Sequence, residues 1–168
     1  MVESSAPKQT ETTQRWKVAL SAEGRSLPLH TKIEFSRRGT TEDSRVDPVA
    51  ASVLADYGLM PVLAPHYPLA AAIRQKVGAL VGRRTVQARD VFDLAVLIAN
   101  AGGRVEALRP VRAKIPKAIE RCMEVSYGDY KAQVVSYLKP DQIDALGSRE
   151  AWDALQSQVV EFLEKAPR

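Results

Sequence analysis

Two charged residues fall where the surrounding pattern predicts apolar side chains, and their types suit phosphate chemistry. At about 100° per residue, Lys76 lies within the apolar arc of one predicted helix and Asp90 within the apolar arc of the next. Glu34 alternates with Ile33 and Phe35 on a predicted strand, so it points away from the apolar face. A lysine can bind a polyphosphate, and carboxylates can hold Mg²⁺ or orient the lysine. These residues predict a site between a small sheet and two helices.

Each of these positions also has a purely structural interpretation. Lys76 can extend its amine to solvent past Ile73 and Leu80. Asp90 can complement the dipole in the first turn of its helix, or pair with Lys76 or Arg89. Burying a charge without a partner or ligand is costly, which is why these positions stand out. The structural and functional interpretations both stay open at this point.

The composition is that of one folded domain. The chain has 168 residues, of which 45% are hydrophobic and 26% charged, so it can form a core. It contains no apolar run of about 18 residues and no recognisable signal sequence, which argues against membrane insertion and secretion. The single Cys122 cannot form an internal disulfide, and two histidines add no zinc-type spacing. We therefore expect a cytoplasmic protein without membrane association.

The charge is modest, at +4 from 24 basic and 20 acidic residues, but it is unevenly distributed. Residues 141–164 are acidic, whereas the first half carries a set of basic residues: Lys32, Arg37, Arg38, Arg74, Lys76, Arg83, Arg84 and Arg89. This half could favour a phosphate-bearing partner. The alternative is an ordinary solvated surface, since dedicated nucleic-acid binders are more basic.

Hydrophobic patterning predicts an α+β fold, with a small antiparallel sheet of two to three strands followed by a mostly helical bundle. We expect a disordered tail over residues 1–14, which has few large apolar side chains, a strand-containing subdomain over 15–66 and a helical domain over 67–168. Strands are expected over residues 16–20, 29–35 and 61–64. Helices are expected over residues 47–56, 67–82, 88–101, 110–125, 129–138, 140–146 and 149–165, with Ser148 capping the last.

Three blocks of sequence, in this order, resemble the AbiEii-type nucleotidyltransferase toxins of the polymerase-β-like nucleotidyltransferase superfamily. Residues 31–38 (TKIEFSRR) resemble the family's strand that bears the third active-site acid, matched by Glu34. Residues 67–83 are similar to its helix with an active-site lysine, matched by Lys76. Residues 89–94 (RDVFDL) resemble its RDxxD helix, matched by Asp90 and Asp93. The likeness covers the chain from about Trp16 to the end.

The resemblance implies a partial nucleotidyltransferase-like fold and transfer of a nucleotide from an NTP to an RNA hydroxyl, with tRNA as the expected acceptor. Lys76 would contact the triphosphate, Glu34 would be the ligand that assists Mg²⁺, and Asp90 would orient Lys76 or act near the attacking hydroxyl. Asp93 completes the implied catalytic set. Phosphate binding would be shared by Lys76, Arg83, Arg84 and Arg89. Such an enzyme would act as a toxin paired with an antitoxin.

One motif of the family has no match. A Gly-Gly or Gly-Ser turn and two closely spaced aspartates that hold Mg²⁺ should precede the Glu34 strand, but no aspartate occurs before Asp43, and residues 39–43 look like a surface loop. The resemblance therefore implies a C-terminal portion that is inactive alone or completed in trans by another half.

Two further function classes remain open. The first is a catalytically dead derivative that binds a protein or nucleic acid, and the second is a helical interaction domain that resembles the family by chance. A truncated fold exposes sheet edge and apolar surface, so we expect a partner or a homo-oligomer.

Overall fold

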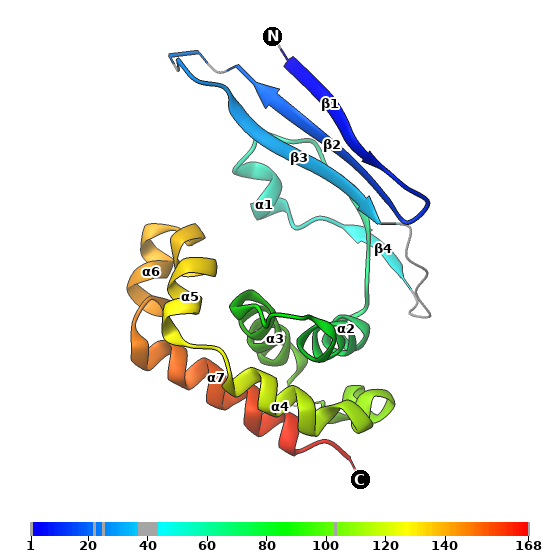
Figure 1. The fold of residues 1–168 in the computed structure, drawn as a ribbon, viewed down its shortest axis with the longest axis vertical. Coiled ribbons are helices and arrows are strands. Elements are labelled where there is room, and N and C mark those ends of the chain that lie inside the picture. Colours follow the sequence, from blue (N-terminus) through cyan, green and yellow to red (C-terminus); the bar gives the residue numbers. More distant parts are fainter. Residues whose placement is uncertain (1, 22, 25, 37–43, 103, 168) are drawn as a thin grey trace. The chain divides into compact units, whose positions relative to one another are not determined.

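A computed structural model describes residues 2–21, 23–24, 26–36, 44–102 and 104–167, and it divides into two units, Met1–Thr41 and Glu42–Arg168 (Figure 1). The predicted division placed the boundary between residues 66 and 67, whereas the contacts place it after Thr41. Arg37, Arg38 and the predicted surface loop at 39–43 lie outside the described residues. The α+β fold class is confirmed by three-stranded and two-stranded antiparallel sheets combined with a helical bundle.

The first unit is a three-stranded antiparallel sheet in the order β1-β2-β3, formed by Val2–Gln9, Thr13–Leu20 and Leu29–Ser36. Strands β2 and β3 pair in continuous register, with Trp16 opposite Ile33 and Arg15 opposite Glu34. The Trp16 ring meets the edge of the Phe35 ring at 5.7 Å on one face. Arg15 and Glu34 form an ion pair on the other face, which confirms the predicted orientation of Glu34.

The expectation of a disordered tail differs from the structure, in which Val2–Gln9 forms strand β1. This strand pairs with β2 from Val2 opposite Leu20 to Gln9 opposite Gln14, and the register shifts between Ser5 and Lys8. Composition misses such a strand because its backbone hydrogen bonds to β2 hold it in place, while the described side chains at residues 4–7 and 9 are exposed. Pro7 lies at the irregularity, where the missing N–H costs no regular ladder hydrogen bond.

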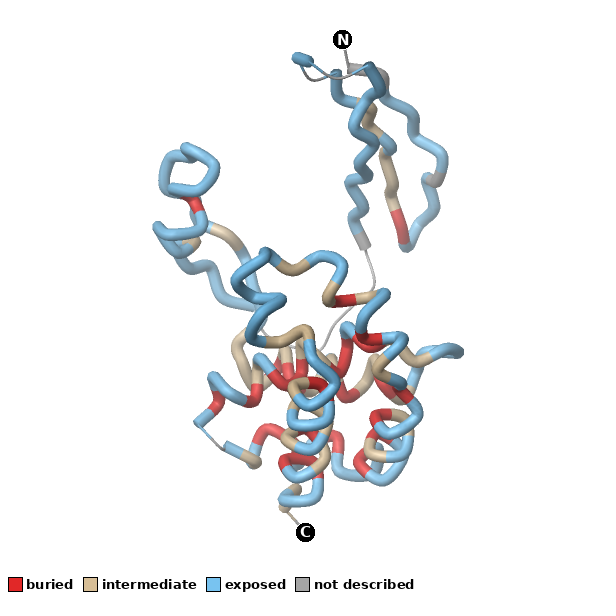
Figure 2. Tube along the Cα trace, turned by 90° about the vertical axis from the view of Figure 1, so that its left-hand side faces the viewer, coloured by how far each residue is buried: buried red, intermediate tan, exposed pale blue. Residues whose placement is uncertain are grey.

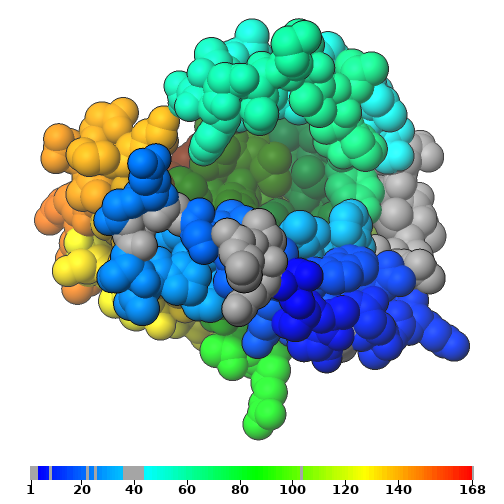
Figure 3. Space-filling model, turned by 90° about the horizontal axis from the view of Figure 1, so that it is seen from above, coloured from blue at the N-terminus to red at the C-terminus, as the bar shows by residue number. Residues whose placement is uncertain are grey.

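The start of the second unit combines a two-stranded sheet with a short helix. Strand β4 (Arg45–Pro48) pairs antiparallel with β5 (Leu63–His66), and α1 spans Ala51–Ala55. The predicted helix start at Asp47 is wrong, because the Asp47 carboxylate pairs with His66 Nε2 at 2.7 Å across the two strands. The side chains around α1 form part of the molecular surface in Figure 3. Val53 on α1 and Leu59 and Met60 after it are exposed.

The rest of the second unit is helical, as expected. Helices α2 (Leu69–Gly82), α3 (Ala88–Ala101), α6 (Pro140–Leu146) and α7 (Arg149–Glu164) lie within about two residues of their predicted ranges. Ser148 caps α7 by accepting a hydrogen bond from the Ala151 N–H at 3.0 Å, as predicted.

Two of the expected helices are broken into shorter pieces. The stretch expected to be one helix over 110–125 consists of the 3₁₀ segment η1 (Val105–Lys114) followed by α4 (Ile115–Met123). Pro116 lies at the start of α4, where its missing N–H is harmless. The helix expected over 129–138 is split into α5 (Tyr127–Gln133) and the 3₁₀ segment η2 (Val135–Tyr137).

The hydrophobic core lies among the helices of the second unit, where the buried residues in Figure 2 are concentrated. It is formed by α2, α3, η1, α4, α5 and α7. At its centre the Tyr130 ring stacks on Trp152 at 4.6 Å and lies 6.2 Å from Phe92. The Tyr130 hydroxyl donates to the Leu146 carbonyl at 3.0 Å, so the buried polar group is satisfied. Within the residues described, no helix is both long and apolar enough to cross a bilayer.

The thiol of Cys122 is expected to be unreactive in the folded protein. Its side chain is fully buried in the core, and burial raises the pKa of the Cys122 thiol to about 12. Only the thiolate is nucleophilic, so native protein at pH 8 should resist alkylation by iodoacetamide over hours, whereas protein in denaturant should be alkylated within minutes. Mass spectrometry of the intact chain measures this, and rapid alkylation of the native protein would show that α4 opens frequently.

Candidate functional site

The buried carboxylate of Asp90 is the centre of a charged cluster between α2 and α3. Asp90 lies in the first turn of α3 and is only 1% exposed. Arg83 donates from Nε to Asp90 Oδ2 at 2.5 Å and from Nη2 to Oδ1 at 3.4 Å. Lys76 Nζ donates to Asp90 Oδ1 at 3.4 Å and to Asp93 Oδ2 at 2.5 Å. The structure thus brings together four residues singled out from the sequence.

The cluster is formally neutral, with two cations and two carboxylates, and this explains how Asp90 is tolerated in the core. Asp90 is buried, but the side chains of Lys76, Arg83 and Asp93 are 30%, 41% and 44% exposed. Of the structural alternatives that the sequence left for Asp90, the ion pair with Lys76 is observed. Arg89, the other partner considered for Asp90, makes no ion pair with it among the described residues.

The cluster keeps donors available for a further ligand. Lys76 uses two of its three amine hydrogens on Asp90 and Asp93. Arg83 binds Asp90 through one edge of its guanidinium, so within the described part of the chain Nη1 has no hydrogen bond. A phosphate oxygen could therefore bind both cations without displacing Asp90.

Arg121 positions the main chain of Arg83 by hydrogen bonds to carbonyl oxygens. The chain leaves α2 at Arg83, whose backbone is extended. Arg121, in the last turn of α4, donates from Nη2 to the carbonyl oxygens of Arg83 at 2.7 Å and Arg84 at 3.2 Å. Cations near a helix C-terminus satisfy its carbonyl groups in this way. Sequence reasoning missed Arg121, because nothing in its own helix indicates contact with residues about forty positions earlier.

The remaining predicted phosphate-binding residues lie beside the cluster. Arg84 and Arg89 are exposed, and neither side chain has an ion pair within the residues that the structure describes. Two guanidinium groups without an ion pair among the described residues add positive charge near the neutral cluster, and on the Arg84 side Glu124 and Asp129 line the same pocket. The added positive charge suits an anionic ligand.

Glu34 belongs to the first unit, on β3, where it accepts hydrogen bonds from Arg15 Nε at 2.7 Å and Nη2 at 2.6 Å. Lys76, Asp90 and Asp93 belong to the second unit. Its predicted role as an active-site acid remains a prediction.

Asp90 and Asp93, paired with cations as they are, do not fit the Mg²⁺ that the nucleotidyltransferase resemblance implies. Among the described residues, no group of three or more histidine, cysteine or acidic side chains is placed to hold a metal ion. Asp90 and Asp93 are neutralised by Lys76 and Arg83, and Glu34 is paired with Arg15. Magnesium prefers several oxygen ligands and retains water. We therefore assign no step of the chemistry to a metal held by these residues.

Comparison with solved structures identifies the class of fold. The crystal structure of JHP933 from Helicobacter pylori matches with a TM-score of 0.54 at 19% identity, covering 98% of this chain and 67% of that one. A candidate nucleotidyltransferase from H. pylori matches with a TM-score of 0.53 at 17% identity, covering 99% of this chain and 68% of that one. The chain has a fold shared with these proteins and spans about two thirds of their length.

The sequence match then identifies the family. The model of the nucleotidyl transferase AbiEii toxin family, from type IV toxin–antitoxin systems, matches residues 1–168, and the chain belongs to this family. The resemblance inferred from Glu34, Lys76 and the RDxxD block is thereby confirmed at the level of the family. No curated protein is significantly similar to the chain.

Proposed function

We propose that this chain takes part in nucleotide transfer from an NTP to an RNA hydroxyl, with tRNA as the acceptor class. In that reaction the acceptor oxygen attacks the α-phosphorus and pyrophosphate leaves. The observation that carries the proposal is the neutral cluster of Lys76, Arg83, Asp90 and Asp93, in a chain of the AbiEii nucleotidyltransferase toxin family.

Each residue of the cluster has a defined part in this proposal. Lys76 binds the triphosphate with its remaining amine hydrogen, and Arg83 binds it with Nη1. Asp90 fixes both cations in a partly desolvated setting, where their attraction for phosphate is stronger than in water. Arg84 and Arg89 attract the polyanion and hold it nearby. The product is a modified RNA, and a cognate antitoxin would prevent this modification in the cell.

A specific observation favours a second candidate, a binding module without catalysis of its own. Asp90 and Asp93 are both paired with cations, and no group of three or more acidic, histidine or cysteine side chains among the described residues is placed to hold a metal ion. In this second reading the cluster binds a protein or nucleic-acid partner and no nucleotide is transferred. An assay for transfer of labelled nucleotide to RNA by the isolated chain distinguishes the two candidates, because only the first predicts a labelled RNA.

A nucleotidyltransferase must bind an NTP whether the chain acts alone or is completed by another half, so nucleotide binding tests the first proposal. A ligand that binds only the native state, at about 100 times its Kd, stabilises the protein by about 2.7 kcal/mol. For a chain of this length that corresponds to a rise in Tm of roughly 5–10 °C. We expect at least one NTP to produce such a shift in the wild type, measured with and without added Mg²⁺.

The Lys76→Ala variant should lose this shift while its ligand-free Tm stays within a few degrees of the wild type, because Lys76 is partly exposed. The matched control is Lys117→Ala, which removes a lysine with a single surface ion pair to Glu120. An unchanged shift in Lys76→Ala would contradict the proposed role of the cluster. A loss of shift in both variants would indicate a nonspecific charge effect.

A further inference from the structure

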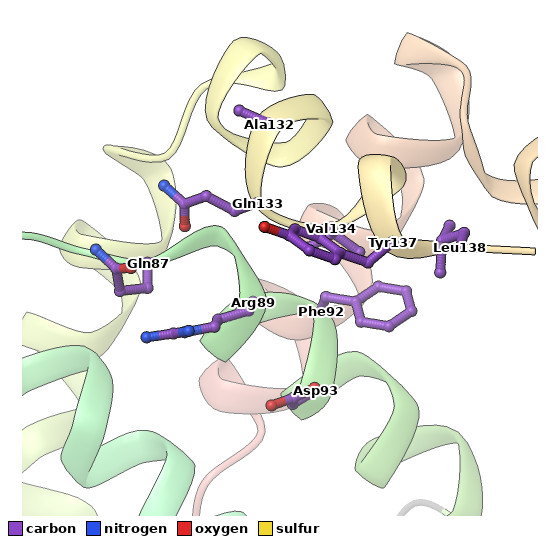
Figure 4. Close-up of a pocket in the computed structure, with 9 residues that line it drawn as sticks. All are labelled: Gln87, Arg89, Phe92, Asp93, Ala132, Gln133, Val134, Tyr137 and Leu138. Atoms are coloured by element: carbon purple, nitrogen blue, oxygen red, sulfur yellow. The ribbon is translucent and has the colours of Figure 1, made fainter. Parts of the chain in front are cut away.

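A pocket of about 550 Å³ lies beside the charged cluster, between the start of α3 and the segment formed by α5 and η2 (Figure 4). Phe92 comes from α3 and Tyr137 from η2, and Val134 and Leu138 add aliphatic surface. Arg89 and Asp93 also line it, on the side of α3. Its volume falls within the range of small-molecule sites, roughly 300–1,000 Å³.

The wall formed by α3 is fixed by contacts to the core. The Phe92 ring lies 6.2 Å from Tyr130, which in turn stacks on Trp152 at 4.6 Å. The side-chain oxygen of Gln133 accepts a hydrogen bond from the Ala88 N–H at 2.8 Å, which ties α5 to the beginning of α3. Such a wall is preorganised, and preorganisation reduces the entropy lost on binding.

The opposite side offers an aromatic ring that is free to stack. Tyr137 is 81% exposed, and no aromatic contact of its ring occurs within the part of the chain that the structure describes. Two side-chain amides complete the lining. The Gln133 Nε2 group makes no hydrogen bond among the described residues. Gln87 Nε2 makes only long hydrogen bonds, to the Val86 carbonyl at 3.3 Å and the Thr85 carbonyl at 3.5 Å. Aromatic faces with amide donors and acceptors at the edge suit a planar heterocycle.

The pocket and the charged cluster share a residue. Asp93 lines the pocket and also accepts a hydrogen bond from Lys76. Arg89 lines the pocket as well and has no ion pair within the described part of the chain. Because Lys76 neutralises Asp93, a ligand with its ring in the pocket can extend an anionic group toward Arg89 and the remaining amine hydrogen of Lys76.

We propose that this pocket binds a nucleobase, which stacks on Tyr137 and Phe92 while its phosphates lie toward Lys76 and Arg89. The ligand class rests on the proposed function. Two sources share this chemistry, the base of the incoming NTP and an unpaired base of the acceptor RNA. The NTP is the source favoured by the short path from the pocket to Lys76 through Asp93.

Titration of Tyr137 variants tests the proposal. Isothermal calorimetry on the full chain measures Kd for each NTP, for inorganic tripolyphosphate and for a short single-stranded RNA. Base–aromatic stacking accounts for about a tenfold change in affinity or more. We expect Tyr137→Ala to weaken NTP binding about tenfold and to leave tripolyphosphate binding unchanged. Tyr137→Phe, which keeps the ring, should restore most of the affinity, and Met123→Ala on the exposed surface of α4 serves as the unrelated control.

The outcomes separate this inference from the proposed function. Weaker binding of RNA alone in Tyr137→Ala would assign the pocket to a base of the acceptor. Wild-type affinities in Tyr137→Ala, together with lost NTP binding in Lys76→Ala, would overturn the pocket and leave the proposed function standing. If the wild type binds neither NTP nor tripolyphosphate, the proposed function fails, and the pocket survives only if RNA binding depends on the Tyr137 ring.

Discussion

Replacing Asp90 with alanine is expected to destabilise the protein by about 3 kcal/mol. The carboxylate is 1% exposed and accepts hydrogen bonds from both Lys76 and Arg83. Removal of one partner of a buried ion pair costs about 3–5 kcal/mol, because the remaining charges lose their compensation. The lower end applies here, since Lys76 and Arg83 are partly exposed and can turn toward water. Urea denaturation followed by circular dichroism measures the free energy of unfolding.

Asp93→Ala is the matched control for this substitution. Asp93 lies on the same helix and pairs with the same lysine, but its side chain is 44% exposed. Exposed ion pairs contribute about 0–1 kcal/mol, so this variant should stay close to the wild type. Equal losses in the two variants would contradict the view that burial makes Asp90 the centre of the cluster.

Replacing Trp152 with alanine is expected to cost about 3–5 kcal/mol of unfolding free energy. Trp152 lies on α7, is 1% exposed and stacks on Tyr130 at 4.6 Å. Its removal leaves a cavity among helices that cannot close around it fully. Thermal and urea unfolding measure the loss, and near-ultraviolet circular dichroism reports whether the remaining aromatic packing is retained.

The second tryptophan provides the control, because Trp16 is half-buried on the sheet of the first unit. Trp16→Ala should leave the helical unit's unfolding transition unchanged, since the two tryptophans lie in separate units. A loss below 1 kcal/mol for Trp152→Ala would show that the aromatic stack is not part of the stabilising core.

The central residues of the candidate site could be predicted from the sequence because they are charged residues at positions where the helical pattern predicts apolar ones. Lys76 and Asp90 were detected as charges on apolar arcs, and the structure pairs them. Arg121 and Gln133 could not be found in this way. Both act on main-chain groups far away in sequence, and only tertiary packing brings those groups within reach.

The fold was predicted best where one helical face is clearly apolar, as in α2, α3 and α7. It was predicted least well where local signals are ambiguous. Asp47 followed by proline is typical of a helix start, but the same pair is compatible with an edge strand, and the contact with His66 decides between them. The first strand was missed because its residues give little apolar signal, whereas backbone pairing with β2 orders it.

The contacts of Arg121 join the charged surface to the interior of the helical unit. Because this side chain on α4 holds the carbonyl groups of Arg83 and Arg84, the main chain that carries the Arg83 side chain is tied to α4, which packs on α7 and α2. Thermodynamic linkage is reciprocal, so if this contact raises the affinity for an anion, the bound anion stabilises the attachment of α4 by the same free energy. We therefore expect anion binding at the charged surface to slow amide hydrogen exchange in α4.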